Sequence, residues 1–340
     1  TYYGTDLLGL GLWRKYGPDD LFKRLGSSME ADLWRDVAEF YHPAMQNVPG
    51  PYIRAYGMDM NGYTALLGIC IALAMDDHFA KTPEGNSARA SFEKIDRLAP
   101  IPTPDLEPPK VSEWTYLPLF CILKAQVPPE AMENMLKFRG PHHFDRTAIQ
   151  GRHRYDVNVA IENRWMMGTA TGLQKRWEQH CPGTIHWLAD SGTTADEEPP
   201  RVGWLLVRGE NGADCTIDLG QAAEAEAVES TVESVDQTSS DPARPDDSQT
   251  IRPTMHVTLP QVDANYPLRL HLFAPGIQPS MCEGDRWNLP GISLEAASPL
   301  GKPTVKLVND HYLGRVVEVQ WDLPENLQPG STVLTIRPVE

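Results

Sequence analysis

The chain has 340 residues, with 30 Lys and Arg against 46 Asp and Glu, which gives a formal net charge of −16. Nucleic acid and anionic membrane surfaces attract basic patches, so this charge balance argues against both as partners. A hydrophobic fraction of 41% is enough for a sizeable core and excludes a wholly disordered chain. No apolar run approaches the roughly 20 residues that a membrane-spanning helix needs.

The five cysteines are far apart and form no CxxC pair. Neither a disulfide framework nor a zinc knuckle is therefore predicted. No HxH or HExxH spacing occurs, and no metal or cofactor is expected.

The first 140 residues have helical periodicity. Apolar residues 7–13 form one segment that Gly17-Pro18 ends, and a second runs from Pro18 to about Tyr41, with Gly26-Ser27-Ser28 as a candidate break. Residues 61–75 are apolar on nearly all sides, which predicts an inner helix. A proline-rich connection over 82–112 is followed by an apolar segment at 114–125 and a helix at 129–138.

After Gly140-Pro141 the hydrophobic period changes from helical to alternating. Short alternating or β-branched segments predict strands at 156–162, 184–188, 202–208, 215–219, 255–259, 268–273, 304–308, 315–321 and 332–336. Strands without intervening helices favour an antiparallel sandwich. The predicted fold class is α+β, with an α-helical domain over 1–140 followed by a β-sandwich domain over 147–340.

Residues 221–250 interrupt the predicted sandwich. They contain eight acidic residues against a single Arg244, with almost no apolar anchors. This composition predicts a solvated, mobile insertion, with an acidic docking segment as the less favoured interpretation.

The loop between the second and the inner helix concentrates polar groups beside apolar structure. Its prolines stiffen a segment that carries His42, Asn47, Tyr52, Arg54, Tyr56 and Asp59. In an extended segment Tyr52, Arg54 and Tyr56 point the same way, so one cation would face two phenols and lower a tyrosine pKa below its usual value of about 10. The structural alternative, in which Arg54 pairs with Asp59 or Asp6, has equal weight.

The order of elements resembles the polysaccharide lyases built from an (α/α) toroid and an antiparallel β-sandwich, the heparinase II/III and chondroitin/alginate lyase group. The resemblance implies a carbon–oxygen lyase that cleaves an acidic, uronate-containing polysaccharide by β-elimination. It also implies that Asn47 and Arg54 neutralise the uronate carboxylate, that His42 removes the C5 proton, and that Tyr52 or Tyr56 protonates the leaving oxygen. The sequence supplies about half the helices of a closed toroid, so a partial toroid is expected.

Other side chains are candidates for binding a carbohydrate or another small-molecule substrate. Aromatic rings can stack on sugar faces, although most such rings fill cores, and arginines could line a basic groove for a polyanion. The substrate-binding candidates are Asp59, Trp114, His142, His143, Arg152 and Trp187. Further arginines available for such a groove are Arg146, Arg154 and Arg164.

Two other function classes fit the same pattern. A small helical domain would leave an open surface, which favours a non-catalytic carbohydrate-binding or interaction protein. The Tyr, Arg and His residues of the loop could also serve a small-molecule isomerase or cyclase. The lyase hypothesis predicts that Arg54, Tyr52 and Tyr56 converge with His42 or Asn47 in one open cleft between the helices and the sandwich.

Overall fold

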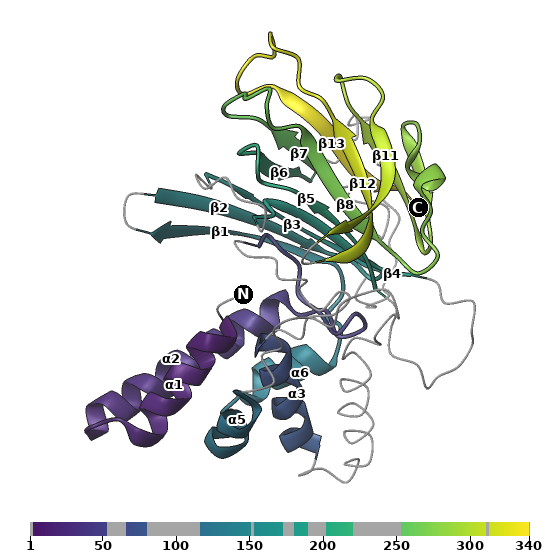
Figure 1. Cartoon of the computed structure of the whole chain (residues 1–340). Coiled ribbons are helices and arrows are strands. Elements are labelled where there is room, and N and C mark those ends of the chain that lie inside the picture. The colour runs from purple at the N-terminus through teal and green to yellow at the C-terminus, as the bar shows by residue number, and fades with distance from the viewer. Residues whose placement is uncertain are drawn as a thin grey trace, which may run out of the picture.

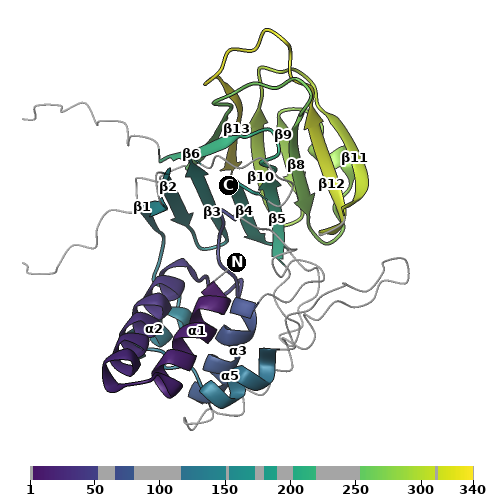
Figure 2. The same ribbon diagram turned by 60° about the vertical axis from the view of Figure 1, so that its left-hand side comes forward.

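The computed structural model describes residues 3–52, 66–79, 116–150, 153–172, 180–189, 202–219, 253–310 and 313–339. Within these ranges helices come first and antiparallel strands follow, which confirms the α+β class. The proline-rich connection over 82–112 and the acidic insertion over 221–250 lie outside the described residues. The helices gather at one end of the molecule next to the larger of two sheets (Figures 1 and 2).

The described helices share one apolar core. They are α1 (Tyr3–Tyr16), α2 (Asp20–Phe40), α3 (Leu66–Phe79), α5 (Leu117–Leu123) and α6 (Pro129–Leu136). The α2 helix starts where the sequence predicts, because the Asp19 side chain caps it by accepting the Phe22 amide at 2.8 Å. Residues 66–75 of the predicted inner helix belong to α3, whose described side chains up to Ala74 are mostly buried.

The candidate break at Gly26 is a helix contact instead. The α2 helix runs through this position without interruption. A Cβ atom on Gly26 would lie 2.6 Å from the Arg14 backbone nitrogen on α1. Glycine is therefore required for the close approach of α1 and α2, because any Cβ atom at this position would overlap α1.

The strands form two antiparallel sheets. The larger has the order β1-β2-β3-β4-β5-β8-β12-β11 and the smaller β6-β7-β13-β10-β9. The strands of the larger sheet are β1 (His142–Gln150), β2 (His153–Ile161), β3 (Trp165–Thr171), β4 (Gly183–Leu188), β5 (Val202–Val207), β8 (Leu268–Phe273), β11 (Thr304–Asp310) and β12 (Gly314–Trp321). Those of the smaller sheet are β6 (Asp214–Asp218), β7 (Thr254–Thr258), β9 (Arg286–Leu289), β10 (Ile292–Ala297) and β13 (Thr332–Val339).

Each of the nine predicted strand segments overlaps an observed strand, while β1, β3, β9 and β10 were not predicted. The sheets begin at His142 rather than at 147, because β1 pairs along its whole length with β2 despite its polar sequence. In β3 a nearly continuous buried run replaces the alternation that marks a half-exposed strand.

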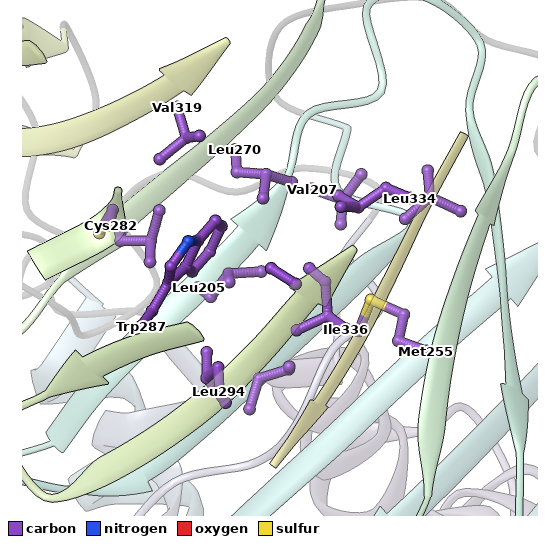
Figure 3. Close-up of a cluster of buried hydrophobic side chains, with 14 of the residues drawn as sticks. Leu205, Val207, Met255, Leu270, Cys282, Trp287, Leu294, Val319, Leu334 and Ile336 are labelled. Atoms are coloured by element: carbon purple, nitrogen blue, oxygen red, sulfur yellow. The ribbon is translucent and has the colours of Figure 1, made fainter. Parts of the chain in front are cut away.

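The two sheets enclose a common apolar core, as in a sandwich. Leu205, Val207 and Leu270 come from the larger sheet and lie opposite residues of the smaller one (Figure 3). The facing residues of the smaller sheet include Leu294, Leu334 and Ile336. Alternate residues of the larger sheet point the other way, toward its outer face.

Ion pairs and a separate apolar cluster join the helices to the larger sheet. Arg146 on β1 binds Asp36 at 2.6 Å and also binds Glu39, both on α2. Phe40, at the end of α2, packs with a cluster that includes Ile161 of β2. No helix among the described residues is long and apolar enough to cross a membrane.

Candidate functional site

The chain that leaves α2 crosses the outer face of the larger sheet. The Gly50 amide donates to Thr184 Oγ1 on β4 at 2.8 Å, and Tyr52 pairs with Cys181 through two backbone hydrogen bonds of 2.9 and 2.8 Å. A Cβ atom on Gly168 of β3 would lie 1.9 Å from the Gly50 carbonyl oxygen. Residues 48–52, the crossing segment, therefore lie directly against β3 and β4.

The crossing segment places the Tyr52 phenol beside His186 of β4. The Tyr52 hydroxyl lies 2.8 Å from the Val48 carbonyl oxygen and 3.3 Å from His186 Nε2. Because a carbonyl only accepts, the hydroxyl proton goes to Val48, and His186 Nε2 must donate to the phenol oxygen. This leaves the lone pair on His186 Nδ1, which has no hydrogen-bond partner among the described residues.

Burial determines the charge of this pair. His186 is fully buried, and burial lowers the pKa of its imidazole to about 3. Tyr52 is 3% exposed. The imidazole is therefore neutral at neutral pH, and its Nε2 donates to the phenol oxygen.

His42 holds the start of the loop in place. Its Nε2 lies 2.9 Å from the Glu162 carbonyl oxygen, and its Nδ1 accepts the Met45 amide at 3.3 Å. Burial lowers the pKa of this imidazole, so the ring stays neutral with both nitrogens engaged. The Asn47 side chain accepts the Val48 amide at 2.8 Å, and the Asn47 carbonyl accepts the His42 amide.

The expectation of one open cleft is wrong for the three loop residues that the structure describes. His42, Asn47 and Tyr52 are all buried, and the interactions above engage each with different groups. Folding the loop onto the sheet satisfies its polar groups internally. Five further candidates, from the loop and from the substrate-binding residues, lie outside the described residues: Arg54, Tyr56, Asp59, Trp114 and Arg152.

Trp187 is a core residue, which corrects its assignment to substrate binding. Its ring is fully buried between the sheets, and its Nε1 donates to the Pro290 carbonyl at 2.8 Å. Trp187 alternates with His186 on β4, so the two side chains point to opposite faces. His143 is exposed, and His142 is half-buried with its Nδ1 2.8 Å from the Gly140 carbonyl oxygen.

Two of the arginines expected to line a basic groove are paired with acids. Arg146 holds α2 as described, and Arg154 binds Asp156 at 2.9 Å on β2. These pairs neutralise the cations that a polyanion would need. Among the described residues, no group of three His, Cys, Asp or Glu residues is arranged to hold a metal ion.

The outer face carries other buried polar residues near His186, of which Arg208 was not a candidate from the sequence. His186 pairs in register with Trp204 of β5, and Arg208 follows the end of β5. Trp204 Nε1 and two nitrogens of Arg208 have no hydrogen-bond partner among the described residues. Alternation within 184–188 and 202–208 could have placed these side chains on one face, although their strand order was not readable from the sequence.

Comparison with known proteins adds a partial match. Residues 1–98 match the family described as a domain of unknown function (DUF8769). The match includes α1, α2, α3 and the crossing segment, while all described strands lie beyond it. Searches of curated proteins and of solved structures give no match.

Proposed function

We propose that the protein is a carbon–oxygen lyase that cleaves a uronate-containing glycan by β-elimination, and that Tyr52 and His186 move the protons. The observation that supports this proposal is the hydrogen-bonded contact between a phenol and a neutral imidazole where the helices meet the larger sheet. The resemblance to the lyases, which rests on the order of helices and strands along the chain, also motivates the proposal, and we propose that the helices are part of an (α/α) toroid.

The reaction needs a base for C5–H and an acid for the oxygen that leaves C4. The His186 Nδ1 lone pair takes the C5 proton, the C4–C5 double bond forms, and the C4–O bond breaks. The Tyr52 hydroxyl gives its proton to the leaving oxygen and receives one from His186 Nε2. The imidazole ends neutral with its proton on Nδ1, and both residues remain uncharged, which suits their buried positions.

The roles given to the loop change in one respect. His42 has both ring nitrogens engaged, so His186 replaces it as the base. Arg54 and Asn47 keep the proposed task of neutralising the uronate carboxylate, since a C5 proton beside an ionised carboxylate is too weakly acidic for an imidazole. Tyr56 stays the alternative to Tyr52 as the acid.

The direct test is the ultraviolet absorbance of unsaturated uronate products over a panel of polygalacturonate, alginate, chondroitin sulfate, hyaluronan and heparan sulfate. Tyr52→Phe and His186→Gln should each lower the rate by about 100-fold or more, the usual contribution of a general acid or base. Tyr266→Phe is the matched control because Tyr266 is an exposed tyrosine on the β7–β8 connection, and it should leave the rate unchanged. Absence of product from every polymer would refute the proposal.

Access to Tyr52 supplies a second test. The side chain is 3% exposed, so a glycan must widen the contact between the crossing segment and β4. Hydrogen exchange at the Tyr52 and Cys181 amides, which bond across this contact, should accelerate when a cleaved polymer is added to His186→Gln. Unchanged or slower exchange at both amides would contradict this route to the phenol.

A further inference from the structure

Arg208 is a buried cation with few partners. Its side chain is 2% exposed, and its Nη2 lies 3.6 Å from Glu210 Oε1. Its Nε and Nη1 atoms have no hydrogen-bond partner among the described residues. A guanidinium stays protonated in proteins, so three N–H groups are left without an acceptor in a buried place. Such groups are costly to bury unless another molecule satisfies them.

A second arginine shares the same carboxylate. Arg269 Nη1 on β8 lies 3.1 Å from Glu210 Oε2, and the buried Arg269 Nε also has no partner among the described residues. Two guanidinium groups therefore share the single carboxylate of Glu210. Side-chain exposure rises from 2% at Arg208 through 18% at Glu210 to 34% at Arg269. The group is consequently reached from the Arg269 side.

The strand register relates this group to the proposed catalytic pair. Arg208 and Trp204 share the outer face of the sheet because they are four residues apart, and Trp204 pairs with His186. At about 3.3 Å per residue their Cα atoms are about 13 Å apart along the strand direction. That separation is longer than one sugar unit, so the arginines would contact a different unit from the one that reacts.

We propose that Arg208 and Arg269 form a subsite for an oxyanion, a carboxylate or sulfate ester on an acidic oligosaccharide, separate from the Tyr52–His186 pair. That the ligand is a saccharide rests on the proposed lyase function. The N–H groups of Arg208 Nε and Nη1 and of Arg269 Nε have no acceptor among the described residues. An oxyanion has only acceptor atoms, so it could accept hydrogen bonds from all of them. Glu210 holds the two guanidinium groups in position and competes with the ligand for their N–H groups.

The test is calorimetric titration of the full chain at constant ionic strength. The probes are a galacturonic acid trisaccharide, glucose 6-sulfate, inorganic sulfate and the uncharged maltotriose. Arg269→Gln, at the accessible rim, should weaken binding of the charged probes about tenfold, since one charge-assisted contact is lost. Glu210→Gln should strengthen the binding of the same probes. It frees N–H donors of Arg208 and Arg269 and removes a negative charge that repels an anion. Arg286→Gln, an exposed arginine on β9 of the smaller sheet, should change nothing.

The two substitutions separate a binding site from a structural ion pair. A structural pair predicts that Glu210→Gln lowers the melting temperature without tightening any anion, and this result would overturn the subsite. Stronger binding of the trisaccharide than of glucose 6-sulfate identifies a carboxylate ligand, and the reverse order identifies a sulfate ester. Binding of inorganic sulfate alone would overturn the saccharide assignment.

Failure of the subsite and failure of the lyase proposal give different results. Arginine-dependent binding of the trisaccharide with no unsaturated product from any polymer retains the subsite and removes the lyase function. The opposite outcome removes the subsite alone: unsaturated product forms, and neither Arg269→Gln nor Glu210→Gln changes its rate of formation or the affinity for any charged probe. Arg208→Met keeps the length of the side chain without its charge and provides a second variant if the others fold poorly.

Discussion

The Tyr52 hydroxyl lies 3.3 Å from His186 Nε2, which joins the chain leaving α2 to the fourth strand of the larger sheet. The contact fixes the imidazole tautomer, because the hydroxyl proton is donated to the Val48 carbonyl. It also places a titratable group in a fully buried position. Two measurable properties follow, one of acid stability and one of packing.

Acid should destabilise the protein through His186. In the folded chain burial lowers the pKa of His186 to about 3, whereas the unfolded chain has the ordinary value of 6.5. The unfolded state therefore binds more protons between these values. The stability from neutral His186 is present above pH 6.5 and is lost as the pH falls toward 3, by at most about 1.4 kcal/mol per pH unit. Urea unfolding at a series of pH values measures this slope.

A matched pair of variants isolates the contribution of His186. His186→Gln cannot titrate, so its free energy of unfolding should depend less on pH between 6.5 and 4 than that of the natural chain. His143→Gln removes an exposed histidine and should retain the natural slope. Equal slopes for all three proteins would show that His186 is not buried as a neutral group.

Gly168→Ala should push the crossing segment off the sheet. The new methyl group would lie 1.9 Å from the Gly50 carbonyl oxygen, and backbone on both sides leaves little room to adjust. Overpacking of this kind costs about 1–3 kcal/mol or more. Urea unfolding should show the loss, and the Tyr52 amide should exchange faster. Gly9→Ala on α1 has open space around its Cβ and should stabilise the helix slightly.

Local chemistry made much of the fold predictable. Asp19 caps α2 where the sequence places a helix start, and alternation identified strands such as β8 and β12. The pattern failed where tertiary contacts override it. Gly26 suggested a helix break, but it is a glycine because α1 packs closely against it, and this tertiary contact is not visible in the sequence. In β3, burial of both faces removed the alternation that would have revealed the strand.

The site was less predictable because its parts come from distant segments. The sequence predicted that Tyr52 and His42, which belong to one loop, lie together in one cleft. Tyr52 instead contacts His186, 134 residues away. His42 bonds to Glu162 instead. Arg208 gave no local signal, since an arginine at the end of a strand is normally exposed, and only its burial in the folded chain makes it unusual.

Glu30→Gln should strongly destabilise the helical part. Glu30 binds Arg14 Nε at 2.6 Å, and its other oxygen accepts the Gln126 amide at 3.0 Å, so one carboxylate ties α1, α2 and the chain after α5 together. Both side chains are largely buried, at 3% and 12% exposure. Removing one partner of such a pair costs about 3–5 kcal/mol because the other charge stays buried.

The comparison for this change is Asp32→Asn on the same helix. Asp32 pairs with Arg35 near the surface, where solvent screens the interaction, and its loss should change the melting temperature little. If the two variants unfold at the same temperature, the Arg14–Glu30 pair does not join the helices as the structure indicates.

Trp187→Phe should affect stability and leave ligand binding unchanged. The Trp187 ring is fully buried between the sheets, and the substitution leaves the Pro290 carbonyl without its 2.8 Å donor. The smaller ring also leaves a cavity, and together these effects should cost about 2 kcal/mol or more. Trp13→Phe, at a position 41% exposed on α1, should have little effect on unfolding.

Calorimetric affinity for the galacturonic acid trisaccharide should match the natural chain in both variants, because Trp187 faces the interior of the sandwich while His186 and Trp204 face outward. A selective loss of trisaccharide affinity in Trp187→Phe, with unchanged unfolding, would instead return this tryptophan to the binding surface.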